Sequence, residues 1–208
     1  MPMKTLIIIL PFLLLTSQNF AQCTKGDVNK IRKKIENRGS KTELQDSVLQ
    51  KLKINNDLIV GYSKFNTTWM HVPSQYFLFA LNKNGCIGYH YIIKKNSINN
   101  EKPLTIDSVI IPNQIASMIL TTIVNNKAWE IKRNENDSTN IFCVDAINKF
   151  NCQISDASYK SLILLTKSSN IVSTFYAPEY FENECCPGNK DRQTFIKCYN
   201  VLYGIIKN

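Results

Sequence analysis

The densest group of chemically useful side chains in this chain lies near its C-terminus. Cys185 and Cys186 are adjacent there, and Cys198 follows. Acids and bases surround them: Glu179, Glu182, Glu184, Lys190, Asp191 and Arg192. Such a cluster fits a general acid–base pair. Acids at a helix start also complement the helix dipole, which is the more common reason for finding them there. We therefore predict that the stretch from Tyr176 to the end of the chain, here called the C-terminal clasp, fixes the last helix onto the sheet.

The seven cysteines predict disulfide bonds, which are the default in an exported chain. Cys143 and Cys152 flank a short connection between two predicted strands. We expect Cys198 to bond to Cys185 or Cys186, and Cys86 to bond to the other of these two, although spacing alone does not fix the connectivity. The alternative is a thiol/disulfide redox role for Cys185-Cys186. Against it, a thiol-exchange enzyme is expected to carry Cys-x-x-Cys, which this chain lacks.

The chain has two histidines, His71 and His90. His71 lies in a predicted loop near Trp69, and these two residues are our ligand-binding candidates because binding residues are concentrated on loops. A hydrolase that pairs His71 with a C-terminal carboxylate is the enzymatic alternative. His90 stands between Tyr89 and Tyr91 in a predicted strand, so alternation places it on the opposite face from both. Neither histidine has a second ligand at helical or strand spacing, so we predict no metal site and no cofactor.

The N-terminus predicts export. Lys4 precedes an apolar run over residues 6–15, and small residues surround Ala21, as in a secretory signal peptide covering residues 1–21. We expect residues 22–208 to form one secreted or periplasmic domain, with no transmembrane span, which needs about 20 apolar residues. Cys23 stands where a bacterial lipoprotein carries its lipid. Gln22 replaces the small residue that such a signal requires, so a lipid anchor is the less favoured alternative.

Two helices are predicted next. Val28, Ile31 and Ile35 give residues 27–38 an apolar stripe, and Gly39 is placed to end this helix. Ser40 and Glu43 form a capping-box pattern at the start of a second helix. Together the two helices predict an N-terminal helical hairpin packed on a sheet.

Most of the remaining chain reads as short strands. Asn84-Gly85 between two apolar, aromatic-rich runs is the strongest hairpin signal, with both residues expected at positive φ. One helix is inserted after Pro112 and continues to about residue 124. The other expected strands are residues 58–62, 104–110, 128–132, 140–146, 150–154, 161–166 and 171–176. Short connections favour an antiparallel sheet, so the fold class is α+β, with an amphipathic C-terminal helix packed on the sheet.

Composition narrows the function further. The formal net charge is +9, but the cations are mostly lysines spread along the chain, which does not indicate a nucleic-acid interface. Signatures of nucleotide binding and of serine hydrolases are absent from the sequence. We therefore favour a non-catalytic interaction domain of the envelope or extracellular space that binds a protein, peptide or envelope component, such as an inhibitor or a toxin-neutralising protein. Aromatic side chains are its expected contacts: Trp69, Tyr76, Tyr89 and Tyr91.

Overall fold

The computed structural model describes residues 25–41, 44, 46–65, 73–94, 102–132, 140–144, 149–154, 157–207. The predicted signal peptide, Cys23, Trp69 and His71 lie outside these residues, as does Glu43 of the predicted capping box. No helix in the described part of the chain is long and apolar enough to cross a membrane.

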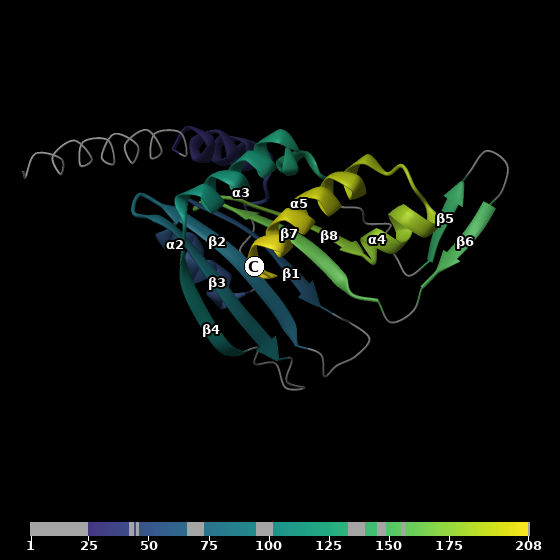
Figure 1. Ribbon diagram of the computed structural model, residues 1–208, viewed down its shortest axis with the longest axis horizontal. Helices are drawn as coiled ribbons and strands as arrows, with labels where there is room; N and C mark the ends of the chain where they lie inside the picture. Colours follow the sequence, from purple (N-terminus) through teal and green to yellow (C-terminus); the bar gives the residue numbers. More distant parts are fainter. Residues whose placement is uncertain are drawn as a thin grey trace, which may run out of the picture.

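A six-stranded antiparallel sheet forms the centre of the molecule, in the order β4-β3-β2-β1-β7-β8 (Figure 1). Two further strands pair with each other in a separate hairpin. The strands are β1 (Leu58–Phe65), β2 (Ser74–Asn82), β3 (Gly85–Lys94), β4 (Lys102–Ile111), β5 (Asn140–Val144), β6 (Lys149–Gln153), β7 (Tyr159–Leu165) and β8 (Asn170–Tyr176). The predicted α+β class with an antiparallel sheet is confirmed.

The helices cover both faces of this sheet. They are α1 (residues 25–38), α2 (Ser47–Asn55), α3 (Asn113–Asn125), α4 (Pro178–Tyr180) and α5 (Lys190–Lys207), with a short 3-10 turn η1 (Ala128–Glu130) and a π-turn η2 (Phe181–Cys185). In Figure 1, α3 and α5 lie side by side across one face, and α2 lies behind the sheet. The predicted inserted helix and C-terminal helix are both present.

The buried residues form two main cores, one on each face. The larger core holds Ile31 and Ile35 of α1 together with side chains of α3 and α5. The smaller holds Val48 and Leu49 of α2. The expected helical hairpin is therefore wrong in its packing, because α1 and α2 contribute to opposite faces of the sheet.

The chain crosses from one face to the other around Gly39 and Ser40. The Gly39 N–H donates to Ile35 O (2.6 Å), and a Cβ on Gly39 would lie 2.7 Å from Asn170 O, so glycine is required here for close approach. Ser40 does not cap α2; its backbone instead exchanges two hydrogen bonds with Asn170 at the start of β8. The cap is Asp46, whose Oδ1 accepts from the N–H groups of Val48 and Leu49.

The predicted β2–β3 hairpin is confirmed, but its turn lies one residue earlier. Asn82 pairs with Gly85, so Lys83 and Asn84 occupy the tip. The Asn84 N–H donates to Asn82 Oδ1 (2.8 Å), which starts the turn at Asn82. Gly85 has φ +134°, while Asn84 is not at positive φ.

Residues 128–132 do not form the expected strand. Lys127 adopts a left-handed conformation (φ +45°), and the following 3-10 turn places Ala128 and Trp129 in the core between α3, α5 and the sheet. The apolar residues that predicted a strand are buried here by a turn instead.

Candidate functional site

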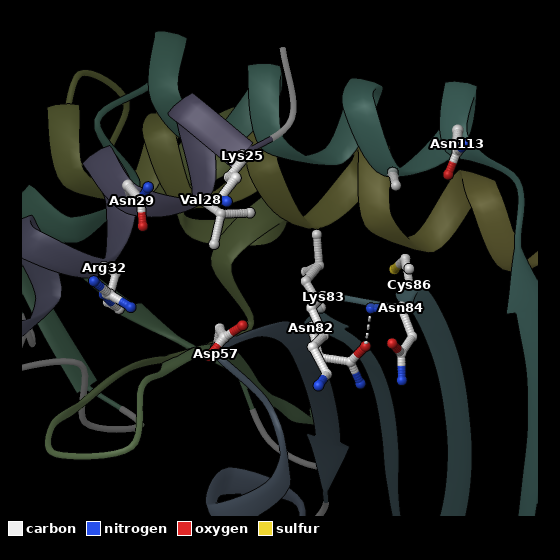
Figure 2. A pocket seen from close by; sticks show the side chains of 13 residues that line it. Lys25, Val28, Asn29, Arg32, Asp57, Asn82, Lys83, Asn84, Cys86 and Asn113 are labelled. Carbon is white, nitrogen blue, oxygen red and sulfur yellow. Dashed lines mark hydrogen bonds between the residues drawn. The ribbon is translucent and has the colours of Figure 1, made fainter. Parts of the chain in front are cut away.

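A pocket of about 510 Å³ lies where α1, the β2–β3 turn and the start of α3 meet. Figure 2 shows side chains of α1 facing the turn, with Asn113 of α3 at the far side. Four separate segments of the chain build its wall: Lys25, Val28, Asn29, Arg32, Asp57, Leu81, Asn82, Lys83, Asn84, Gly85, Cys86, Asn113 and Ala116. Its volume is within the range of small-molecule sites, roughly 300–1,000 Å³.

One face of α1 supplies the upper wall of the pocket. Lys25, Asn29 and Arg32 recur at helical spacing and therefore share that face. Ile31 and Ile35 on the adjoining face are fully buried in the core. Because this packing fixes the rotation of α1, the polar face is held toward the pocket.

The charges around the pocket are strongly unequal. Lys25, Arg32 and Lys83 are cationic, and Asp57 is the one carboxylate in the wall. Asp57 is already paired, since its Oδ1 lies 3.4 Å from the Lys167 ammonium. Within the described residues Lys25 and Lys83 make no ion pair. The wall therefore presents an excess of positive charge.

Arg32 contributes an incompletely satisfied donor. Its Nε lies 3.8 Å from a Glu36 carboxylate oxygen, which is too long for a hydrogen bond. This Nε is buried and has no hydrogen-bond partner among the described residues. Buried donors are normally paired, so this Nε is an unsatisfied polar group beside the pocket.

The floor of the pocket is held by asparagine side chains. Asn82 Oδ1 accepts from the Asn84 N–H, and Asn82 Nδ2 donates to Asn56 Oδ1 (3.0 Å). Asn56 in turn donates to Leu52 O of α2 (2.8 Å). This chain of hydrogen bonds fixes the β2–β3 turn before any ligand arrives.

The far wall adds further polar groups. Asn113 is the first residue of α3, whose N-cap Pro112 makes no side-chain capping bond and whose first turn has no acidic residue. Cys86 lies in the same wall, but burial raises the pKa of its thiol to about 12. Cys86 is therefore a packing residue here and not a nucleophile.

The C-terminal clasp has the opposite character, because its central charges, Glu182 and Arg192, are buried and paired with each other. Arg192 Nε donates to Glu182 Oε2 (3.1 Å), with the two side chains 3% and 9% exposed. Glu182 Oε1 accepts from the Gly188 N–H and from Gln193, and Arg192 also donates to Cys186 O. Burial alone would raise the pKa of Glu182, but the bonds from Gly188, Gln193 and Arg192 and the Arg192 charge lower it below its usual value.

These contacts assign the clasp a structural role. These acids do more than complement a helix dipole, which was the expected role. Glu182 links η2 to α5 through its ion pair with Arg192, and Glu179 pairs with Lys160 of β7. Both carboxylates are already engaged with cations. A hydrolase that pairs His71 with one of them stays a prediction, because His71 lies outside the described residues.

The cysteines differ from the expected disulfide framework. Cys86 and Cys198 are buried free thiols, so the predicted bond from Cys198 to Cys185 or Cys186 is absent, as is one from Cys86. The register places Cys143 opposite Phe150 and Cys152 opposite Ile141, not opposite each other. The Sγ atoms of Cys185 and Cys186 lie 3.6 Å apart, against about 2.05 Å in a disulfide, so these two cysteines are not bonded to each other. Neither of them is a free thiol.

The predicted aromatic contacts are largely part of the fold. Tyr91 is fully buried, and its hydroxyl donates to Asp46 Oδ2 (3.0 Å). Tyr76 stacks on Tyr91 with ring centroids 4.6 Å apart. His90 faces the other side of the sheet and stacks on Phe77 at 4.2 Å, as alternation predicts. In the described residues no cluster of His, Cys, Asp and Glu is placed to hold a metal ion.

Sequence reasoning did not identify the pocket, although one signal for it is present. Lys25, Asn29 and Arg32 form a polar stripe beside the apolar stripe of the first helix, which marks a face free for contact. No family model matches this chain, and no curated protein matches it.

Proposed function

We propose that this protein is an exported, non-catalytic binding domain whose pocket between α1, the β2–β3 turn and α3 receives an anionic group of its ligand. The observation that carries the proposal is the charge imbalance of the wall: Asp57 pairs with Lys167 and Arg32 with Glu36, while Lys25 and Lys83 make no ion pair within the described residues. A carboxylate or phosphate group supplies the missing negative charge and acceptors.

The chemistry of the wall favours a hydrophilic ligand. Four carboxamides line the pocket beside the cations: Asn29, Asn82, Asn84 and Asn113. Asn82 already holds the turn through its bonds to Asn84 and Asn56. The carboxamides of Asn29, Asn84 and Asn113 can donate and accept hydrogen bonds, which suits hydroxyls or amides that flank the anionic group. Two of the three cations are lysines, which bind anions as mobile point charges and do not require one fixed geometry. An envelope component that carries carboxylate or phosphate groups fits this description.

Isothermal titration with citrate and with inorganic phosphate at low salt tests the proposal. We expect saturable binding, weakened at least about tenfold by the double substitution Lys25→Gln/Lys83→Gln, which corresponds to about 1.4 kcal/mol. The matched control is Lys51→Gln/Lys53→Gln on α2, which removes the same charge away from the pocket. Equal weakening by both doubles, or no saturable binding of either anion, would contradict the proposal.

A second candidate function rests on the vicinal cysteines. Their sulfur atoms lie 3.6 Å apart in η2 and its C-cap, and the carbonyl of Cys186 accepts from Arg192. Cys185 and Cys186 are disulfide-bonded, so a thiol/disulfide redox role at Cys185-Cys186 would require a dithiol to reduce these bonds by exchange, with the dithiol itself becoming oxidised. Mass spectrometry after native alkylation, before and after a mild dithiol reductant, tests it. An unchanged state of Cys185 and Cys186 across that treatment would remove it.

A further inference from the structure

Other segments of the chain contact the β8 edge of the central sheet, whereas the β4 edge is exposed. At the β8 edge, Ser40 pairs with Asn170, and Ser173 Oγ donates to Ile131 O (3.3 Å). At the β4 edge, every residue from 106 to 110 is exposed. Exposed sheet edges offer unpaired backbone groups to another strand, and natural proteins usually cover them or place charges there.

The exposed side chains of β4 are unusually apolar for a bare edge. Ile110 is 83% exposed, Val109 61% and Ile106 51%. The only charged side chain between residues 105 and 111 is Asp107. The ladder with β3 is regular from Thr105 to Ile111, because its one register shift lies beyond, at Ile92/Ile93. This stretch is therefore straight enough to accept a further strand.

The apolar residues are divided between the two faces of β4 in a fixed way. Ile111 packs against the larger core, on the face that carries α3 and α5. A Cβ on Gly88 would contact both Ile111 and Val109, so Val109 points to that face as well. Alternation then places Ile106, Ser108 and Ile110 together on the face that carries α2.

We propose that β4 pairs antiparallel with β4 of a second copy, with the two-fold axis at Ser108, so that two sheets join into one. In this register Ile106 of each copy lies opposite Ile110 of the other, Asp107 lies opposite Val109, and Ser108 lies opposite itself. Directly opposite apolar side chains stabilise an antiparallel pair. The interface is isologous, as in most homodimers.

The neighbouring registers fit less well, which selects this one. An axis at Asp107 places two carboxylates directly opposite each other, which is destabilising. An axis at Val109 places Asp107 opposite Ile111 and Ile110 opposite Ser108. An axis that falls between two residues would place residues from opposite faces of β4 opposite each other, so the isoleucines of the two copies would no longer share one face of the joined sheet. The edge strand is thus self-complementary about Ser108, and a second copy is the occupant that its sequence fits.

Light scattering during size-exclusion chromatography of the exported chain gives the first test. We expect a mass of twice the monomer, Ile110→Lys to produce a monomer, and Ile54→Lys to leave the dimer intact. Ile54 is the matched control because it is 70% exposed but lies on α2. A parent protein that stays monomeric at high micromolar concentration would overturn the proposal.

Cross-linking tests the register itself. Oxidation of Ser108→Cys with copper phenanthroline is expected to give a covalent dimer, because residue 108 faces its own copy. Ile110→Cys is the control, since its two copies lie roughly 13 Å apart along the strands, beyond disulfide reach. The parent chain controls for the native cysteines. Equal cross-linking of both variants, or stronger cross-linking of Ile110→Cys, would contradict the register.

Discussion

The C-terminal clasp and the pocket are both clusters of charged side chains, but they satisfy those charges in opposite ways. In the clasp, Glu182 and Arg192 are buried together, and the glutamate accepts from three donors. In the pocket, Lys25 and Lys83 are exposed and make no ion pair within the described residues. The buried charges of the clasp neutralise each other, whereas two cations of the pocket remain without an ion pair within the described residues.

This difference shows why local density of reactive residue types is a poor guide to function. The clasp has the greater density in sequence, yet the contacts of Glu182 and Arg192 make these two groups part of the fold. The pocket has cations drawn from distant segments, and two of them, Lys25 and Lys83, make no ion pair within the described residues. A binding site differs from a structural cluster in having charged groups that the fold leaves unpaired, and closeness in sequence does not reveal this difference.

The largest expected effect is on the clasp. Glu182→Gln should lower the free energy of unfolding by about 3 kcal/mol, because it leaves the buried Arg192 guanidinium uncompensated. Urea unfolding followed by circular dichroism measures this. Glu179→Gln is the control, since its pair with Lys160 is more exposed and should contribute less than about 1 kcal/mol. Similar losses from both substitutions would mean that the clasp is not the special structural element described.

The clasp should also control stability in acid. The folded pKa of Glu182 lies below its ordinary value of 4.5, so the native state binds fewer protons than the unfolded state. The stability contributed by Glu182 is fully present above that ordinary value and is lost as the pH falls through the folded pKa. Urea midpoints measured across the acid range should therefore fall more steeply for the parent than for Glu182→Gln. Parallel curves would exclude Glu182 as the titrating group.

A smaller effect is expected at the floor of the pocket. Asn82→Ala removes the acceptor for the Asn84 N–H and the donor to Asn56, which should lower the free energy of unfolding by about 1 kcal/mol. Thermal unfolding measures the loss, and Asn55→Ala, on the exposed end of α2, is the control. If Asn82→Ala is neutral, the turn is not held in place by these bonds.

The smallest expected effect is at the pocket cations. Lys83→Gln should change the free energy of unfolding by no more than about 0.5 kcal/mol, because an exposed side chain with no ion pair contributes little to stability. The same urea measurement applies. A loss comparable with that of Glu182→Gln would show that Lys83 is structural and would remove the contrast between the two clusters.

Periodicity and turn chemistry were enough to predict most elements. The stripe of Ile31 and Ile35, the residues around Asn84-Gly85 and the apolar face of the last helix each carried a local signal that tertiary packing preserved. Failures occurred where distant residues decided the outcome. Ser40 resembles an N-cap, but Asn170 takes its backbone bonds and Asp46 caps α2 instead.

The sites were harder to predict than the fold for a related reason. Glu182 and Arg192 are ten residues apart, and only the turn through Gly188 brings them together. The pocket joins residues from α1, the β2–β3 turn and α3 with Asp57 before β1, which no sequence spacing connects. A spatial site of this kind is visible only once the sheet order is known.

The most direct test compares both clusters in one measurement. Citrate titrated into ¹⁵N-labelled protein should shift the amide resonances of residues 82–86 and 113–116 in a saturable manner, while those of residues 182–192 stay fixed. That result would show that the pocket binds an anion and that the clasp does not. Saturable shifts centred on the clasp, or no saturable shift at the pocket, would contradict the account.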